Sequence, residues 1–292
     1  MIQTLSNDIL TVAASTSGAE LQSIRNNRTG YEYLWQGDPT FWKRRSPVLF
    51  PIVGAVWNGV FRMDGREYPM GQHGFARDTE FEIAAEAPED EMWFSLTASD
   101  ATLALYPRKF RLDVGYSLLQ ERIAVMWRVT NLDDKDMYFQ IGAHPAFNIP
   151  GFNASDAVRG YLGFDTGEII SRTIAEKGCM GPALRKIEIT DGLMPLTADT
   201  FAKDAIAATE GRIRRVSLLT RDLAPVLSVL FSSPCIGVWA PKPDAPFVCI
   251  EPWYGLADEA GFTGDFSAKA AVNRLAPGET FKASYTIIIE SV

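Results

Sequence analysis

The chain has 292 residues, of which 47% are hydrophobic and 22% are charged. These fractions are close to the globular average, so they exclude a disordered chain, a collagen and a coiled coil. Lys and Arg number 28 against 36 Asp and Glu, which gives a formal net charge of −8. An acidic chain is a poor nucleic-acid binder, because phosphate contacts require surplus cations. We therefore expect a small neutral molecule as the partner rather than a nucleic acid.

The cysteines and the start of the chain indicate the compartment. Cys179, Cys235 and Cys249 form no CxxC pair and cannot all be paired with one another, and such sparse use is typical of a reducing environment. No Lys or Arg precedes Arg25, so the basic start of a signal peptide is missing. No apolar run approaches the ~20 residues of a membrane helix. We expect a soluble, cytoplasmic protein with no membrane partner.

Apolar residues recur at every second position along much of the chain, as in strands with one buried face. Within residues 60–68, Asp64-Gly65 stands between extended flanks and predicts a β-hairpin, because both residues tolerate positive φ. Further predicted strands are 112–118, 123–129, 137–141, 213–219, 226–231, 236–240, 247–250 and 283–290.

Helical signals are few and short, since only 101–106 and 200–208 have the composition for two helical turns. Many short strands with regular turns predict one all-β domain, residues 1–292, built as a large sandwich of antiparallel sheets with few short helices. A doubly wound α/β fold would need helices between the strands, which the sequence does not supply.

The two histidines stand where strands give way to turn residues. His73 is followed by Gly74, and His144 by Pro145. Loops carried on a rigid sheet are where binding groups concentrate, which favours a functional role. The alternative is a pair of structural histidines, and pattern alone leaves both interpretations open.

Glu251 follows an apolar strand and precedes Pro252, which we expect to end strand pairing. A carboxyl group at the end of a buried strand should be partly desolvated, which raises its pKa towards that of a useful general base. The alternative is a surface Glu that begins a loop.

Other classes of site find little support. Residues 199–204 offer two acids, including Asp204, although acidic loops are ordinary. The histidines and cysteines lack zinc-ligand spacing, and the chain has no Walker loop, dinucleotide fingerprint or GxSxG elbow. We therefore assign no metal and no cofactor.

At these residues the sequence resembles the aldose 1-epimerase (galactose mutarotase-like) superfamily, in particular its LacX-like branch. The matching segments follow the family's order over about positions 45 to 290. They are 46–54, 72–78, 106–118, 144–148, 201–204 and 249–253.

The resemblance implies a galactose mutarotase-like β-supersandwich that interconverts the α and β anomers of an aldose without a cofactor. His144 matches the family's general acid and Glu251 its general base. His73 and Arg77 match positions that contact substrate, and Asp204 matches an acid that binds sugar hydroxyls. We expect the acid and the base to converge on opposite flanks of one bound monosaccharide.

One departure from the family concerns specificity. The Asn-Arg pair of true galactose mutarotases has no counterpart after Gly54, where this chain reads Ala55-Val56-Trp57. Arg77 is the candidate replacement for that arginine, which puts galactose specificity in question.

Two alternatives to a neutral-sugar epimerase stay open. The basic run Lys43-Arg44-Arg45 would suit a hexose-6-phosphate 1-epimerase, although such a run can also be a solvated surface. A non-catalytic sugar-binding module is disfavoured by the presence of both His144 and Glu251, because binding alone requires no acid next to a base. The sequence is compatible with a monomer or a homodimer.

Overall fold

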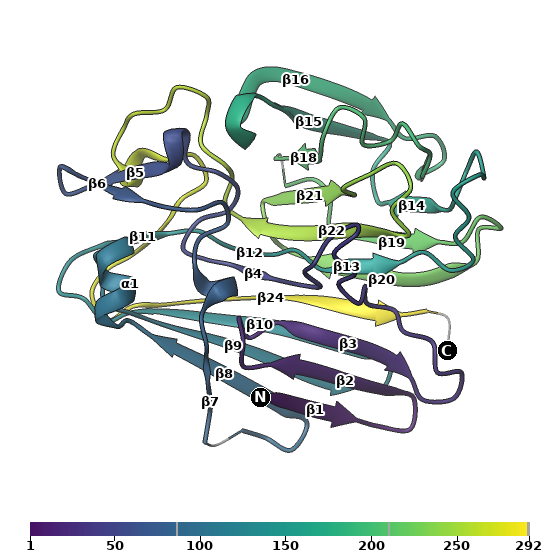
Figure 1. Ribbon diagram of the computed structural model, residues 1–292, viewed down its shortest axis with the longest axis horizontal. Helices are drawn as coiled ribbons and strands as arrows, with labels where there is room; N and C mark the ends of the chain where they lie inside the picture. Colours follow the sequence, from purple (N-terminus) through teal and green to yellow (C-terminus); the bar gives the residue numbers. More distant parts are fainter. Residues whose placement is uncertain (86, 210, 291–292) are drawn as a thin grey trace.

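The computed structural model describes residues 1–85, 87–209 and 211–290. In this part of the chain, two large antiparallel sheets form a sandwich and a three-stranded sheet lies beside them (Figure 1). Apolar side chains from all three sheets share one core, with Leu10 from the small sheet and Ile250 and Ile287 from the two large ones. The predicted all-β antiparallel sandwich is therefore confirmed. The shared core also supports our proposal that residues 1–292 form one domain.

The two large sheets interleave strands from distant parts of the chain. The nine-stranded sheet runs β17 (Leu193–Pro195), β14 (Tyr161–Phe164), β19 (Arg215–Leu219), β20 (Pro225–Phe231), β24 (Thr280–Ile289), β10 (Arg122–Asn131), β9 (Phe110–Leu119), β8 (Glu91–Thr97), β7 (Glu82–Ile83). The eight-stranded sheet runs β16 (Met180–Glu188), β15 (Glu168–Ile174), β18 (Ile206–Ala208), β21 (Cys235–Trp239), β22 (Phe247–Tyr254), β12 (Ile141–Ala143), β4 (Val48–Leu49), with β13 (Ala146–Asn148) also paired to β22.

The smaller elements surround these two sheets. The three-stranded sheet consists of β1 (Ile2–Ser6), β2 (Leu10–Ser15) and β3 (Leu21–Asn26), and two further pairs are β5 (Val60–Met63) with β6 (Arg66–Pro69) and β11 (Met137–Phe139) with β23 (Asn273–Leu275). The helical turns are α1 (Asp100–Leu105) and the 3-10 turns η1 (Trp57–Gly59), η2 (Ala76–Asp78), η3 (Glu176–Gly178) and η4 (Phe266–Ala268). Across the described residues, no helix is long and apolar enough to span a membrane.

The most local sequence signals are confirmed. The hairpin β5–β6 turns at Asp64 and Gly65, whose φ angles of 52° and 72° are those the predicted turn requires. The helix predicted at 101–106 is α1, which begins with a capping box between Ser99 and Thr102.

The helix predicted at 200–208 is wrong. Residues 198–203 form turns, and Ile206–Ala208 is the strand β18. All three residues of β18 are buried, and the strand pairs with β15 on one side and β21 on the other. Pairing on both edges satisfies the backbone, so tertiary structure overrides the helical propensity of an alanine-rich segment.

The expectation that Pro252 ends the strand is also wrong, because β22 continues to Tyr254 and Pro252 lies opposite Ile236 of β21. On its other edge β22 pairs first with β13, as far as Cys249, and then with β12, from Trp253 onwards. The missing N–H of Pro252 falls in the interval between these two short strands. A central proline is tolerated there because that edge needs no ladder donor at this position.

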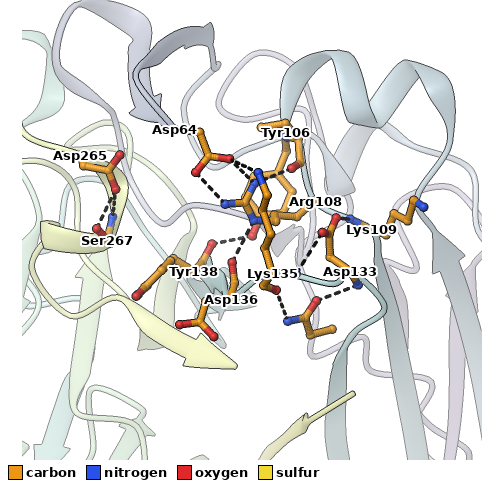
Figure 2. Close-up of polar contacts among 12 residues, drawn as sticks. Asp64, Tyr106, Arg108, Lys109, Asp133, Lys135, Asp136, Tyr138, Asp265 and Ser267 are labelled. Atoms are coloured by element: carbon orange, nitrogen blue, oxygen red, sulfur yellow. Dashed lines mark hydrogen bonds and ion pairs between the residues drawn. The ribbon is translucent and has the colours of Figure 1, made fainter. Parts of the chain in front are cut away.

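A buried arginine ties the hairpin β5–β6 to the sandwich. Arg108 donates to both carboxylate oxygens of Asp64, at 3.0 and 3.1 Å, and to the main-chain carbonyl of Asp136 (Figure 2). Lys135 adds a second cation 3.3 Å from Asp64. Arg108 is only 5% exposed, so this bidentate contact anchors the tip of a hairpin whose other end leads into the segment that carries His73.

Candidate active site

His144 and Glu251 meet at the interval between β12 and β13. Glu251 lies in the middle of β22, on the same face as Cys249 and Trp253, because alternate strand residues share a face. His144 lies on the two-residue link between β12 and β13, and the register of these strands brings that link beside Glu251. Its Nε2 is 3.2 Å from Oε2 of Glu251. The structure therefore brings together the two residues expected to act as acid and base.

Burial controls the protonation of this pair. His144 is 7% and Glu251 is 2% exposed. Burial raises the pKa of Glu251 well above its ordinary value and lowers the pKa of His144 to about 3. Both shifts disfavour the charged forms, so they favour a carboxylic acid next to a neutral imidazole. Among the described residues, neither Oε2 of Glu251 nor Nδ1 of His144 has a hydrogen-bond partner.

Two tryptophans surround the imidazole of His144. The ring of Trp42 stacks on it, with centroids 4.7 Å apart and planes inclined by 27°. Trp239 meets it edge-on, with centroids 5.5 Å apart and planes inclined by 86°. These rings exclude water from one side of the imidazole and fix its orientation.

His73 comes from the turn before η2 and faces the same space. Its ring centroid is 5.5 Å from that of His144. The main-chain N–H of Gly54 donates to Nδ1 of His73 at 3.1 Å. Burial, together with the nearby His144 and Arg77, lowers the pKa of His73 well below its ordinary value. The imidazole is therefore neutral, with its proton on Nε2.

The backbone around His73 explains why glycine follows it. His73 has φ 65°, which is uncommon outside glycine and asparagine. A Cβ on Gly74 would lie 2.1 Å from the carbonyl oxygen of Phe50, so no larger residue fits there. The His-Gly pair in the sequence thus reflects a tight turn against the Phe50 carbonyl.

Arg77 lies on η2 and is the cation that faces the cavity. Its Nη2 donates to the carbonyl of Gln72 at 2.6 Å, whereas its buried Nε makes no hydrogen bond among the described residues and lies 3.7 Å from Oδ2 of Asp78 in an ion pair. Burial and the nearby Arg44 lower the pKa of Arg77 to about 10, so the guanidinium stays charged at neutral pH. Because Arg77 lines the cavity, its guanidinium places a positive charge and N–H donors next to a bound ligand.

Two arginines of the basic run next to the site have protein partners. Arg44 donates to Asp78 at 2.9 Å, and Nη1 of Arg45 donates to the side-chain oxygen of Gln22 at 2.6 Å. These two cations are therefore committed to protein partners, and neither lines the cavity next to His144.

Asp204 lies at the outer wall of the same space. It is exposed, has φ 73°, and its Oδ1 accepts a hydrogen bond from the main-chain N–H of Ala205 at 2.7 Å. The structure thus brings all five expected site residues to one cavity of about 340 Å³, a volume suited to a small molecule. Its walls also include Trp42, Gln72, Met180, Trp239 and Trp253.

Two features of this cavity are not identifiable from the sequence. Trp42 lies in an irregular segment without periodicity, and only its stacking on His144 in the structure identifies it as part of the site. Cys249 is fully buried, and one ligand atom from each of His144, Cys249 and Glu251 lies within 4.8 Å of the other two. This is the group of described residues best suited to hold a metal ion.

The fold and the site together define an antiparallel β-supersandwich with an imidazole–carboxyl pair in the wall of a small-molecule cavity. Residues 1–162 match the family described as Aldose 1-epimerase. The protein LacX (chromosomal) of Lactococcus lactis subsp. lactis is 34% identical over 98% of each chain. The chain belongs to the aldose 1-epimerase family.

Solved structures agree with this assignment. A galactose mutarotase related enzyme from Lactobacillus acidophilus superposes with a TM-score of 0.91 at 32% identity, over 100% of this chain and 98% of that one. A galactose mutarotase-like protein from Lactobacillus casei gives a TM-score of 0.90 at 30% identity, over 99% of this chain and 100% of that one. The predicted galactose mutarotase-like architecture and the LacX-like resemblance are both confirmed.

Proposed function

We propose that the protein is a cofactor-independent aldose 1-epimerase in which His144 and Glu251 exchange protons with the sugar. The observation that carries this proposal is the 3.2 Å contact between His144 Nε2 and Glu251 Oε2 in the cavity wall. Ring opening requires loss of a proton from O1 and gain of one at the ring oxygen, and both oxygens are bonded to C1. An acid and a base that act on such neighbouring atoms have to lie close together.

The contact changes the expected arrangement of the pair. Acid and base touch each other, so they approach C1 from one side rather than from opposite flanks of the sugar. Between them they share one proton, either as imidazolium and carboxylate or as imidazole and carboxylic acid. In the first form Glu251 takes the O1 proton while His144 protonates the ring oxygen, which leaves the second form beside the open-chain aldehyde. Rotation about C1–C2 and reversal of both transfers closes the ring as the other anomer.

Burial favours the open-chain stage of this cycle over the closed-ring stage with the charged pair. The neutral form of the pair accompanies the open-chain sugar, and burial stabilises neutral groups relative to charged ones. The same burial that raises the pKa of Glu251 and lowers that of His144 therefore lowers the free energy of the open-chain complex relative to the closed-ring complex with imidazolium and carboxylate, and this charged form has to be reached first from the neutral pair. Each positioned proton transfer typically contributes about 10²–10⁴-fold to the rate.

Three further residues would hold the sugar. His73 presents Nε2–H as a neutral donor, and Arg77 presents a charged donor for an oxygen that gains negative charge during ring opening. Asp204 at the outer wall would accept from hydroxyl groups.

The charges around the cavity favour a neutral aldose over a sugar phosphate. Arg77 and Asp204 carry opposite charges in the cavity wall, and the side chains of Arg44 and Arg45 are bound to protein partners. A phosphate dianion would need several uncommitted cations. An NMR anomer-exchange panel of hexoses and hexose 6-phosphates tests this: faster exchange of the phosphorylated sugars, suppressed by inorganic phosphate, would reverse the assignment.

Substitution of the pair tests the activity itself. We expect Glu251→Gln and His144→Asn each to reduce anomer exchange by about 10²-fold or more, because each removes one proton transfer. Glu259→Gln is the matched control, since this carboxylate is 58% exposed and pairs with Arg172. Full activity in either pair variant would refute the proposal. Tight sugar binding without any acceleration in the unmodified protein would identify a binding module instead.

A further inference from the structure

Three chemically different metal ligands converge behind the cavity. Cys249 and Glu251 are two residues apart on β22 and point to the same face. His144 reaches this face through the interval between β12 and β13. One donor atom from each residue lies within 4.8 Å of the other two, so small side-chain movements would bring all three to a common ion.

One ligand atom of this cluster is uncommitted, which distinguishes the cluster from ordinary core packing. Oε2 of Glu251, the carboxyl oxygen 3.2 Å from Nε2 of His144, is buried without a hydrogen-bond partner among the described residues. All three residues are at most 7% exposed. An unpartnered buried acceptor is costly unless something satisfies it, and a cation would do so.

We propose that Zn²⁺ binds His144, Cys249 and Glu251 and reversibly inhibits the protein. Imidazole, thiolate and carboxylate are the three ligand types that zinc takes in proteins, and three protein ligands leave its fourth position open towards the cavity. His144 and Glu251 line that cavity, so an ion has a route to the cluster from the sugar side.

Zinc can replace two protons in this cluster without changing its net charge. Without metal, the cluster holds a thiol and an imidazole–carboxyl pair with one proton, so its net charge is zero. Zinc binding displaces the thiol proton and the proton of the pair, which leaves Zn²⁺ with one thiolate, one carboxylate and a neutral imidazole. The net charge is again zero, so a divalent ion enters a buried site without leaving an uncompensated charge there.

Inhibition follows because the ion takes the lone pairs that the reaction uses. A carboxylate bound to zinc no longer accepts the O1 proton, and an imidazole bound to zinc no longer donates to the ring oxygen. This consequence rests on the proposed epimerase activity, whereas zinc binding itself does not.

Equilibrium dialysis of the folded protein against Zn²⁺ tests binding independently of activity. We expect one zinc per chain, and we expect Cys249→Ala to weaken it by roughly tenfold or more, since loss of even an outer-shell partner costs that much. Cys235→Ala is the matched control, because Cys235 is equally buried on the neighbouring strand and belongs to no such group. With Co²⁺ in place of zinc, a thiolate charge-transfer band should appear in the unmodified protein and be lost only with Cys249→Ala.

Activity gives the second arm of the experiment. Zinc should slow anomer exchange, a chelator should restore it, and Cys249→Ala should keep its basal rate while becoming less sensitive to zinc. Equal zinc affinity in Cys249→Ala and the unmodified protein, or no specific binding at all, would overturn the proposal. Zinc binding that depends on Cys249 in a protein without epimerase activity would uphold the site and refute the proposed function alone. Cys249→Ser repeats the comparison if the alanine variant does not fold.

Discussion

Gly54 and His73 hold each other through two hydrogen bonds. The main-chain N–H of Gly54 donates to Nδ1 of His73 at 3.1 Å, and the main-chain N–H of His73 donates to the carbonyl of Gly54 at 2.8 Å. The first bond requires a lone pair on Nδ1, so the proton of the neutral ring lies on Nε2. A loop contact in the cavity wall thus fixes the tautomer of a residue that faces the cavity.

Because the proton of His73 lies on Nε2, the effect of His73→Asn on activity can be predicted. Asparagine tolerates the positive φ at this position, so the fold should survive, but its shorter amide does not reach where Nε2–H points. We expect kcat/KM for anomer exchange to fall about tenfold, as for loss of one hydrogen bond to substrate. Thermal unfolding of the same variant provides the control for folding. An unchanged kcat/KM would remove His73 from the substrate-binding set.

The pH profile of the reaction should lack an inflection near pH 6.5, where a free histidine titrates. The active pair holds one proton, and burial lowers the pKa of His144 to about 3 while it raises that of Glu251. A second proton therefore joins only as pH falls through about 3, and the single proton is lost only as pH rises through the raised pKa of Glu251. We expect kcat/KM to stay flat across pH 5 to neutrality. A loss of activity on acidification with a midpoint near 6.5 would contradict this account.

The same burial predicts that Glu251→Gln stabilises the protein as pH rises. The folded-state pKa of Glu251 lies above its unfolded value, so its contribution to stability is complete below the ordinary carboxyl pKa and is lost as pH rises towards the raised one. Glutamine resembles the protonated carboxyl group at every pH. We therefore expect the free energy of unfolding of Glu251→Gln to increase relative to that of the unmodified protein as pH rises from the ordinary carboxyl pKa towards neutrality.

Thermal unfolding of Glu251→Gln and the unmodified protein at several pH values measures this gain. The difference in Tm between the two proteins should be smallest near pH 4 and should grow towards neutrality. A difference that does not depend on pH would mean that the carboxyl group is ionised in the folded protein at no cost.

The sequence predicts local features of the fold well and long-range ones less well. The turn at Asp64-Gly65 and the strand at 112–118 depend on neighbours in the chain, and both predictions are confirmed, although residues on both faces of that strand are buried. The helix prediction for 200–208 fails because the state of this segment is decided by pairing with β15 and β21, which no local pattern encodes.

In the candidate site too, local features can be predicted from the sequence and long-range contacts cannot. His144 and Glu251 can be selected from their flanking residues and from the resemblance to a family. Their direct contact cannot, because it depends on the interval between β12 and β13 that also accommodates Pro252 within a central strand. The sequence does not identify Trp42 as a site residue, because its stacking partner, His144, is distant in the chain.

The contact between Arg108 and Asp64 should contribute to stability without affecting the site. Arg108→Met keeps an apolar stem but removes the bidentate contact and the hydrogen bond to the carbonyl of Asp136. Asp64 is 45% exposed on its side chain, so water replaces the lost partner, and we expect a cost of about 2 kcal/mol rather than the larger penalty of a stranded buried charge. Arg274→Gln is the control, because its ion pair with Asp136 is exposed and should be worth less than about 1 kcal/mol.

Acid should reduce the difference between Arg108→Met and the unmodified protein. Arg108 holds the pKa of Asp64 below its usual value, so this contribution is present above the ordinary carboxyl pKa and is lost as pH falls through the lowered one. Denaturant unfolding at neutral pH and at about pH 3 measures both values, with sugar anomer exchange at neutral pH as the check on the site. Since the hairpin β5–β6 leads into the turn that carries His73, a fall in activity larger than the fraction of unfolded protein explains would show that the anchor also positions the cavity.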